Sequence, residues 1–151
     1  MNLSDTITIP APRALVYAAL QDPAVLSRCI PGCEELVRTS ESELEAKVVL
    51  KVGPVKARFA GKVTLNPESP PERFTLTGEG SGGVAGFAKG GATVTLEEVG
   101  GETVLTYEAR ADIGGKLAQL GSRLLQGTAT KLAAAFFDDF RTAVTEAPAE
   151  A

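Results

Sequence analysis

The sequence predicts an α+β protein in which a curved antiparallel sheet of about six to seven strands wraps around one long C-terminal helix. Between residues 43 and 113, apolar and polar residues alternate, as they do in strands with one buried and one wet face. From about residue 116 the apolar period changes to the three- and four-residue steps of a helix. The 151 residues, 44% of them apolar, suffice for one core. We therefore expect a single domain over residues 1–146 and a disordered tail at 147–151.

The first thirty residues predict a short strand followed by two short helices. Residues 3–9 have the pattern of a strand that stops before Pro10. Pro12 suits the first position of a helix, where its missing N–H would have no partner, so a helix is expected over residues 13–20. Asp22-Pro23 repeats this start signal and predicts a second helix to about Ser27.

Five further strands are expected at residues 43–52, 55–65, 74–80, 92–97 and 105–113. Gly53-Pro54 and Gly100-Gly101 mark tight turns between them. The glycine-dense residues 78–91 predict a flexible hairpin with Phe87 at its tip. A helix over about residues 116–145, with Gly121 and Gly127 inside it, completes the order.

Many inward positions of the predicted sheet carry small side chains: Ala46, Ala57, Gly61, Gly78, Gly80, Ala92, Ala109 and Ala111. Either the glycines relieve curvature and the helix sits closer to the sheet, or an apolar pocket remains between them. Because no charged residue falls on this face, a guest would be lipid-like or aromatic. The predicted lining residues are Val48, Phe59, Leu76, Phe87, Tyr107, Leu120, Leu124 and Phe136. Among these, Phe87 would be a gate and Tyr107 the polar anchor.

Several chemistries are excluded or disfavoured by composition. The chain has no histidine, which removes the usual Ser-His-Asp and Cys-His mechanisms and His-ligated metals. Cys29 and Cys33 are too few for a disulfide scaffold or a four-thiolate site, and we expect two ordinary thiols. Residues 78–83 satisfy G-x-G-x-x-G, but no helix is expected to follow them, so a dinucleotide site is disfavoured. We therefore expect no catalytic residue, no metal and no covalent cofactor.

Charge and hydropathy indicate the compartment and the partners. A net charge of −4 argues against general nucleic-acid binding. No apolar run approaches the roughly 18 residues of a membrane span, and residues 1–12 lack the features of a signal peptide. A soluble cytoplasmic protein is therefore expected. Five basic residues share the outer face of two adjacent predicted strands: Lys47, Lys51, Lys56, Arg58 and Lys62. This face is either simply solvated or a docking surface for an acidic partner or anionic lipid headgroups.

Four segments resemble one known family: residues 29–34 (CIPGCE), 51–56 (KVGPVK), 78–90 (GEGSGGVAGFAKG) and 114–121 (GGKLAQLG). In this order they resemble the CoxG proteins of the carbon monoxide dehydrogenase system, over roughly residues 1–145. The layout of elements also resembles the helix-grip fold of the SRPBCC superfamily, which includes START domains and the birch-pollen allergen.

The resemblance implies a non-catalytic accessory protein for a molybdenum-containing enzyme of the carbon monoxide dehydrogenase type. It further implies that an apolar ligand such as a quinone or a lipid binds between sheet and helix, and that the protein links the enzyme to the cytoplasmic membrane and its quinone pool. Peripheral contact with the cytoplasmic face of the inner membrane would follow. The alternative is an interaction module with a filled core that docks the enzyme through the basic outer face. A hydrolase or cyclase on the same fold is a third, weaker hypothesis.

Overall fold

The structure, a computed structural model, describes residues 1–146, so the tail predicted at 147–151 lies outside the described residues. The elements are, in chain order, β1 (Asn2–Ile9), α1 (Arg13–Leu20), α2 (Pro23–Cys29), β2 (Cys33–Arg38), β3 (Glu43–Val52), β4 (Val55–Ser69), β5 (Arg73–Ser81), the 3-10 helix η1 (Gly83–Ala85), β6 (Phe87–Val99), β7 (Glu102–Gly114), the 3-10 helix η2 (Gly115–Leu120) and α3 (Ser122–Glu146).

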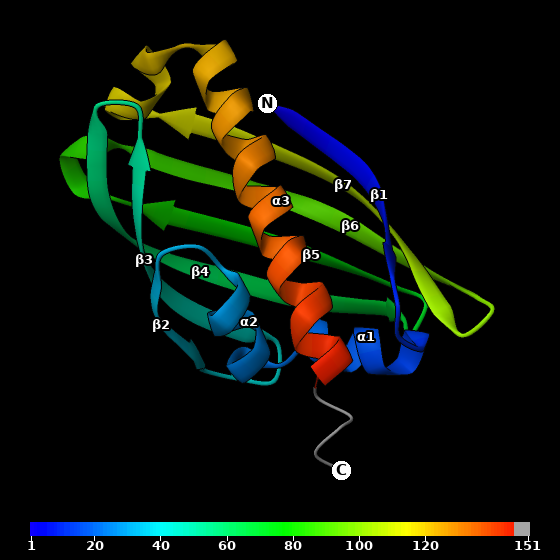
Figure 1. Ribbon diagram of the computed structural model, residues 1–151. Coiled ribbons are helices and arrows are strands. Elements are labelled where there is room, and N and C mark those ends of the chain that lie inside the picture. Colours follow the sequence, from blue (N-terminus) through cyan, green and yellow to red (C-terminus); the bar gives the residue numbers. More distant parts are fainter. Residues whose placement is uncertain (147–151) are drawn as a thin grey trace.

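The strands form one seven-stranded sheet in the order β1-β7-β6-β5-β4-β3-β2, and every neighbouring pair is antiparallel. The sheet curves around α3, which crosses its inner face, while α1 and α2 lie at the end of the sheet where α3 finishes (Figure 1). The predicted α+β architecture is therefore confirmed.

Helix α2 begins as its cap residue predicts, whereas Pro12 is the N-cap of α1 and not its first helical residue. Asp22 is the N-cap of α2, where its Oδ1 accepts a 2.9 Å hydrogen bond from the N–H of Ala24. The first amide of α1, on Arg13, donates to Oε1 of Glu98 at 2.9 Å, so an acidic side chain from β6 satisfies that helix terminus. Both contacts fix the chain reversal that closes one end of the sheet.

The fully buried core lies at this closed end. Phe140 and Val144 of α3 pack there with Val16 and Leu20 of α1 and with Cys29 of α2. The sheet contributes Ile7, Ile9, Leu44, Leu65, Phe74, Val94, Leu96, Leu105 and Tyr107. Thr103, the only buried polar residue among those described, donates its hydroxyl to the carbonyl of Ala11 at 2.7 Å. The closed end is thus well packed, with its buried hydroxyl paired.

The structure differs from the sequence-based expectations in several places, and β4, β6 and β7 are all longer than expected. The long helix does not run from residue 116, because Gly121 takes a φ of +94° and separates η2 from α3, which begins at Ser122. Residues 78–91 do form a hairpin, but with longer strands than expected, since β5 continues to Ser81 and β6 already begins at Phe87. Strand β2 was not predicted at all, because its residues are exposed or half-buried and show no strict alternation.

Candidate functional site

Between the closed core and Val52, which is buried at the far end of β3, the inner face of the sheet is apolar but only partly covered. Register and alternation place Ala46, Val48 and Leu50 of β3 on the same face as the buried Leu44. We use the name open apolar surface for the inward residues that are half-buried or exposed and lie outside the core cluster: Ala46, Val48, Leu50, Ala57, Phe59, Ala88, Ala111, Ile113, Leu120 and Leu124. None of its members is ionisable.

The long helix shows the same division along its length. Phe140, Ala143 and Val144 near its end are buried, whereas Leu125 and Leu132 are half-buried and Leu124 is 39% exposed. Solvent therefore reaches apolar side chains of α3 toward its beginning and not toward its end. Partly accessible apolar side chains therefore occur both on the first half of α3 and on the inner face of the sheet.

Some glycines on the inner face are required by close backbone packing, and others are not. A Cβ on Gly90 would lie 1.9 Å from the carbonyl oxygen of Arg110, so the close approach of β6 and β7 requires glycine there. A Cβ on Gly78 or Gly80 would meet its nearest neighbours at 3.5 Å and 3.6 Å, which are ordinary contacts. Backbone packing does not require glycine at positions 78 and 80, so side chains are missing there for another reason than the close approach seen at Gly90.

Aromatic rings of the core border this surface without covering it. Phe136 stacks on Phe140 with ring centroids 5.9 Å apart, and Phe137 stacks on Tyr107 at 5.5 Å. Phe59 takes part in no ring pair among the described residues, and its ring lies instead against Gly82, where a Cβ would be 2.6 Å away. Among the described residues, Phe59, Tyr107 and Phe136 form no ring pair with one another, although Phe137 contacts both Tyr107 and Phe136.

The eight predicted lining residues fall into distinct places. Val48, Phe59, Leu120 and Leu124 belong to the open apolar surface. Leu76 and Phe136 pack against the core from its edge, and Tyr107 is part of the core. Phe87 was misplaced as a gate, because it stands in register with Ser81 and Gly114 on the outward-facing row of the sheet and is 47% exposed there.

Tyr107 borders a different opening from the one expected. Its side chain lines a hollow of about 300 Å³ between β1 and α3, together with Asp5, Phe137 and Arg141. Burial, and secondarily the Asp5 carboxylate, raise the pKa of Tyr107 above its ordinary value. A phenol held neutral can donate a hydrogen bond, so the role of polar anchor stays a prediction, for a ligand that reaches this side.

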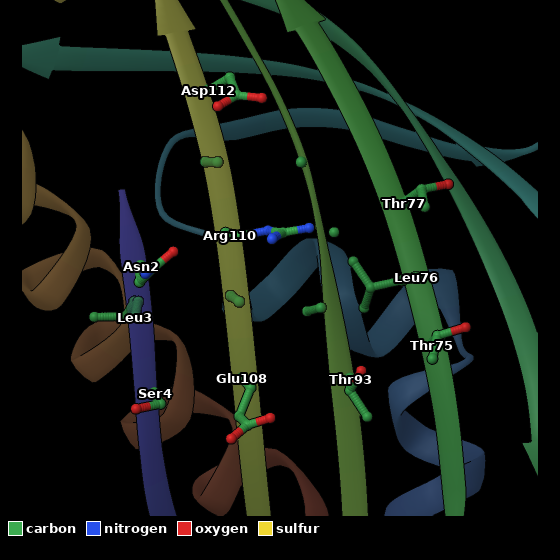
Figure 2. Close-up of a pocket in the computed structure, with 15 residues that line it drawn as sticks. Asn2, Leu3, Ser4, Thr75, Leu76, Thr77, Thr93, Glu108, Arg110 and Asp112 are labelled. Atoms are coloured by element: carbon green, nitrogen blue, oxygen red, sulfur yellow. The ribbon is translucent and has the colours of Figure 1, made fainter.

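The larger hollows lie on the outer face of the sheet. One of about 750 Å³ extends over β1, β7, β6 and β5 (Figure 2). Figure 2 shows the Arg110 side chain extending from β7 toward β6, with Glu108 and Asp112 before and after it on β7. The lining is largely polar and exposed, and it combines no nucleophile with a positioned base. The lining residues of this groove therefore give no reason to propose an active site there.

The five basic residues predicted as a docking face are all exposed, but three of them are neutralised. Arg58 Nε lies 2.7 Å from Oε1 of Glu34, Lys62 Nζ lies 3.0 Å from Oε2 of Glu43, and Lys47 Nζ lies 3.5 Å from Oε2 of Glu35. The sequence missed this because two of the three partners belong to the unpredicted strand β2. Lys51 and Lys56 face each other at the tip of the β3–β4 hairpin and form no ion pair within residues 1–146.

Both cysteines are free thiols. Cys29 is buried in the core, and burial, with a smaller contribution from Asp139, raises the pKa of its thiol. Cys33 is half-buried and its sulfur lies 3.5 Å from the carbonyl oxygen of Glu35. Within the described residues no three His, Cys, Asp or Glu side chains gather as metal ligands would, and no helix is long and apolar enough to cross a membrane.

This arrangement, a long helix gripped by a curved sheet with an apolar inner surface, defines the START-like class of helix-grip proteins. Solved structures agree on the fold. A START superfamily protein from Mycobacterium smegmatis has a TM-score of 0.76 at 10% identity, with 96% of this chain and 97% of that chain covered. The Zhui aromatase/cyclase from Streptomyces sp. R1128 has a TM-score of 0.66 at 14% identity, with 96% and 93% covered. At such identities only the fold is shared.

A conserved protein from Geobacillus kaustophilus is more similar, with a TM-score of 0.90 at 29% identity over 97% of this chain and 96% of that one. No curated protein matches. The model of the carbon monoxide dehydrogenase CoxG family matches residues 6–145, and the chain belongs to this family. Membership associates it with carbon monoxide dehydrogenase as an accessory protein.

Proposed function

We propose that this protein is a non-catalytic accessory protein that carries an apolar ligand, a quinone or a lipid, between α3 and the inner face of the sheet. The observation that carries the proposal is the open apolar surface, where inward residues such as Val48 and Phe59 remain partly accessible in a fold whose other end is fully packed. Such a surface, without ionisable groups, suits an uncharged guest. The enzyme served would be a molybdenum hydroxylase of the carbon monoxide dehydrogenase type, linked in this way to the membrane quinone pool.

The direct test is mass spectrometry of organic extracts from protein purified out of its own host. A quinone or lipid at near-stoichiometric amount is the expected result. Folded protein that repeatedly yields neither, also after exposure to host membranes, would contradict the carrier function.

A matched pair of substitutions tests where the ligand binds. Ala109 lies on the inner face beside the core, and Ala60 lies exposed on the outer face of β4. We expect Ala109→Leu to reduce the bound ligand at least tenfold while unfolding remains cooperative, and Ala60→Leu to change neither.

The alternative is an interaction module with a filled core that docks its enzyme through the basic outer face. In that case Ala109→Leu overpacks the core and costs about 1–3 kcal/mol. Charge reversal at Lys51, Lys56 and Arg58 would then abolish capture of the enzyme. The three ion pairs that neutralise Lys47, Arg58 and Lys62 are the reason we place this alternative second.

A further inference from the structure

One end of the molecule is built entirely from loops and helix starts. The β3–β4 turn meets the first turn of α3 there, since a Cβ on Gly53 would lie 2.8 Å from Cδ2 of Leu124. The η1 turn meets the start of η2, since a Cβ on Gly86 would lie 2.1 Å from the carbonyl oxygen of Gly114. We call residues 51–56, 82–87 and 114–124 the loop end; it lies opposite the closed core (Figure 1).

The charge of the loop end differs from that of the rest of the chain. It carries four of the fifteen basic residues, Lys51, Lys56, Lys116 and Arg123, and none of the nineteen acidic ones. All four are exposed, and none forms an ion pair within the described residues. The nearest acidic residue along the chain is Asp112, on the outer face of β7. A chain with a net charge of −4 thus concentrates unpaired positive charge at one end.

Exposed apolar side chains gather at the same end. Of the large apolar residues that are exposed in the described chain, Val84 is 86% accessible at the η1 turn, Phe87 is 47% accessible beside it, and Leu124 is 39% accessible at the start of α3. Each lies on a different element, and all three belong to the same segments as the four unpaired basic residues. A side chain as exposed as Val84 on a three-residue turn contributes nothing to the core, so packing does not explain it.

We propose that the loop end is a docking surface for an anionic lipid bilayer, with Val84 entering the interface and the four basic residues contacting lipid headgroups. Separate apolar tips ringed by cations match the chemistry of such an interface, where apolar groups enter the acyl boundary and Lys or Arg remains at headgroup level. Residues 51–56, 82–87 and 114–124 include no acidic residue, which favours a uniformly anionic bilayer over a protein surface of mixed charge.

This docking would turn the open apolar surface toward the membrane, a consequence that rests on the proposed carrier function. Leu120 and Leu124 belong both to the loop end and to the open apolar surface. A ligand leaving a bilayer that contacts the loop end would therefore meet apolar side chains directly.

A single introduced tryptophan tests the contact, because the chain contains no native tryptophan. The matched control is Val99, which is 53% exposed at the β6–β7 turn, at the other end of β6. We expect the emission of Val84→Trp to shift to the blue when vesicles of phosphatidylcholine and phosphatidylglycerol, free of quinone, are added. The emission of Val99→Trp should stay unchanged. Equal shifts in both variants, or none in Val84→Trp, would overturn the proposal.

Vesicle sedimentation tests the role of charge. Each basic residue near an anionic surface strengthens binding about fivefold, so Lys51→Gln with Lys56→Gln should weaken it roughly 25-fold. Lys131→Gln is the control, since Lys131 is exposed on α3 outside the loop end and has no ion pair among the described residues. Binding should also fall when salt shortens the screening length. Equal binding to pure phosphatidylcholine, or equal loss with Lys131→Gln, would contradict the proposal.

These experiments separate the docking surface from the carrier function. Vesicle binding is measured on added bilayers and the bound ligand on protein purified from its host, so protein that yields a ligand but binds no vesicle contradicts only the docking surface. Conversely, a protein that never yields a ligand can still show the blue shift of Val84→Trp.

Discussion

The ion pair between Glu34 and Arg58 reduces the net positive charge of the outer face. Nε and Nη2 of Arg58 donate to the two carboxylate oxygens of Glu34 at 2.7 and 3.3 Å, a two-point geometry that fixes both side chains. The hydrogen bonds from Arg58 hold the pKa of Glu34 below its ordinary value, and the Arg58 and Lys47 charges add to this. Because the pair is exposed, its contribution to folding is small.

The depressed pKa of Glu34 gives a pH prediction with a defined sign. A carboxyl whose folded pKa is lowered adds stability above its ordinary value of about 4.5 and loses it as the pH falls through the folded pKa. We expect an NMR titration of the Glu34 side chain to show a midpoint below 4.5 that rises toward that value in Arg58→Gln. Lys62→Gln should leave the midpoint unchanged, since Lys62 pairs with Glu43 instead. A wild-type midpoint at the ordinary value would show that the pair does not form in solution.

At the scale of elements, the break between η2 and α3 determines where the long helix begins. Gly121 has a φ of +94°, a conformation that side-chain-bearing residues rarely adopt, and no atom would obstruct a Cβ there. Gly127 lies inside α3, and a Cβ there would likewise meet open space. The two positions offer equal room and differ in backbone conformation.

The same substitution should therefore have opposite effects at the two glycines. Gly121→Ala must force the left-handed conformation on alanine and should lower the free energy of unfolding by about 1–2 kcal/mol. Gly127→Ala removes a flexible residue from a helix interior and should raise it by roughly 0.5–1 kcal/mol. Urea unfolding of both variants against the wild type measures this. If Gly121→Ala were as stabilising as Gly127→Ala, α3 would extend through residue 121 in solution.

The predictable elements were those whose side chains alternate between core and water. Strand β3 was predicted with its observed bounds because each inward residue is apolar and most outward ones are charged. Strand β2 was invisible because it lies at the sheet edge and buries little on either face. The helix start was misread because Leu117 and Leu120 continue the helical spacing through η2, while the conformation of Gly121 leaves no mark on hydrophobic periodicity.

The candidate site was predictable to the same extent. Alternation placed Val48, Phe59 and Leu76 correctly on the inner face. It failed at Phe87, because few side chains in a glycine-rich segment indicate which residues of the strand face inward. Phe87 is the first residue of β6 and faces outward, whereas its neighbour Ala88 faces inward. The ion pairs of the outer face depended on β2 and were therefore missed with it. Periodicity identifies faces, whereas contacts across the sheet require the register.

Across the whole molecule, a packed end and an open end should differ in their dynamics. The side chains of Phe140 and Val144 are buried in the core. Between Leu124 and Leu132, the apolar side chains of α3 are half-buried or exposed. Local opening costs least where few apolar contacts are buried. In ligand-free protein, hydrogen exchange should thus be faster in the first half of α3 than in the second.

An apolar ligand should remove this difference. With saturating decylubiquinone, we expect exchange over residues 122–132 to slow several-fold and exchange around Phe140 to change little, because the guest replaces solvent only next to the open apolar surface. A ligand present at about 100 times its dissociation constant stabilises the fold by about 2.7 kcal/mol, so the thermal midpoint should also rise by several degrees. Ala109→Leu should lose both effects and Ala60→Leu should keep them. Uniform exchange along α3 without ligand would contradict a binding space next to the open apolar surface. Ligand-induced protection confined to the closed core would contradict it as well.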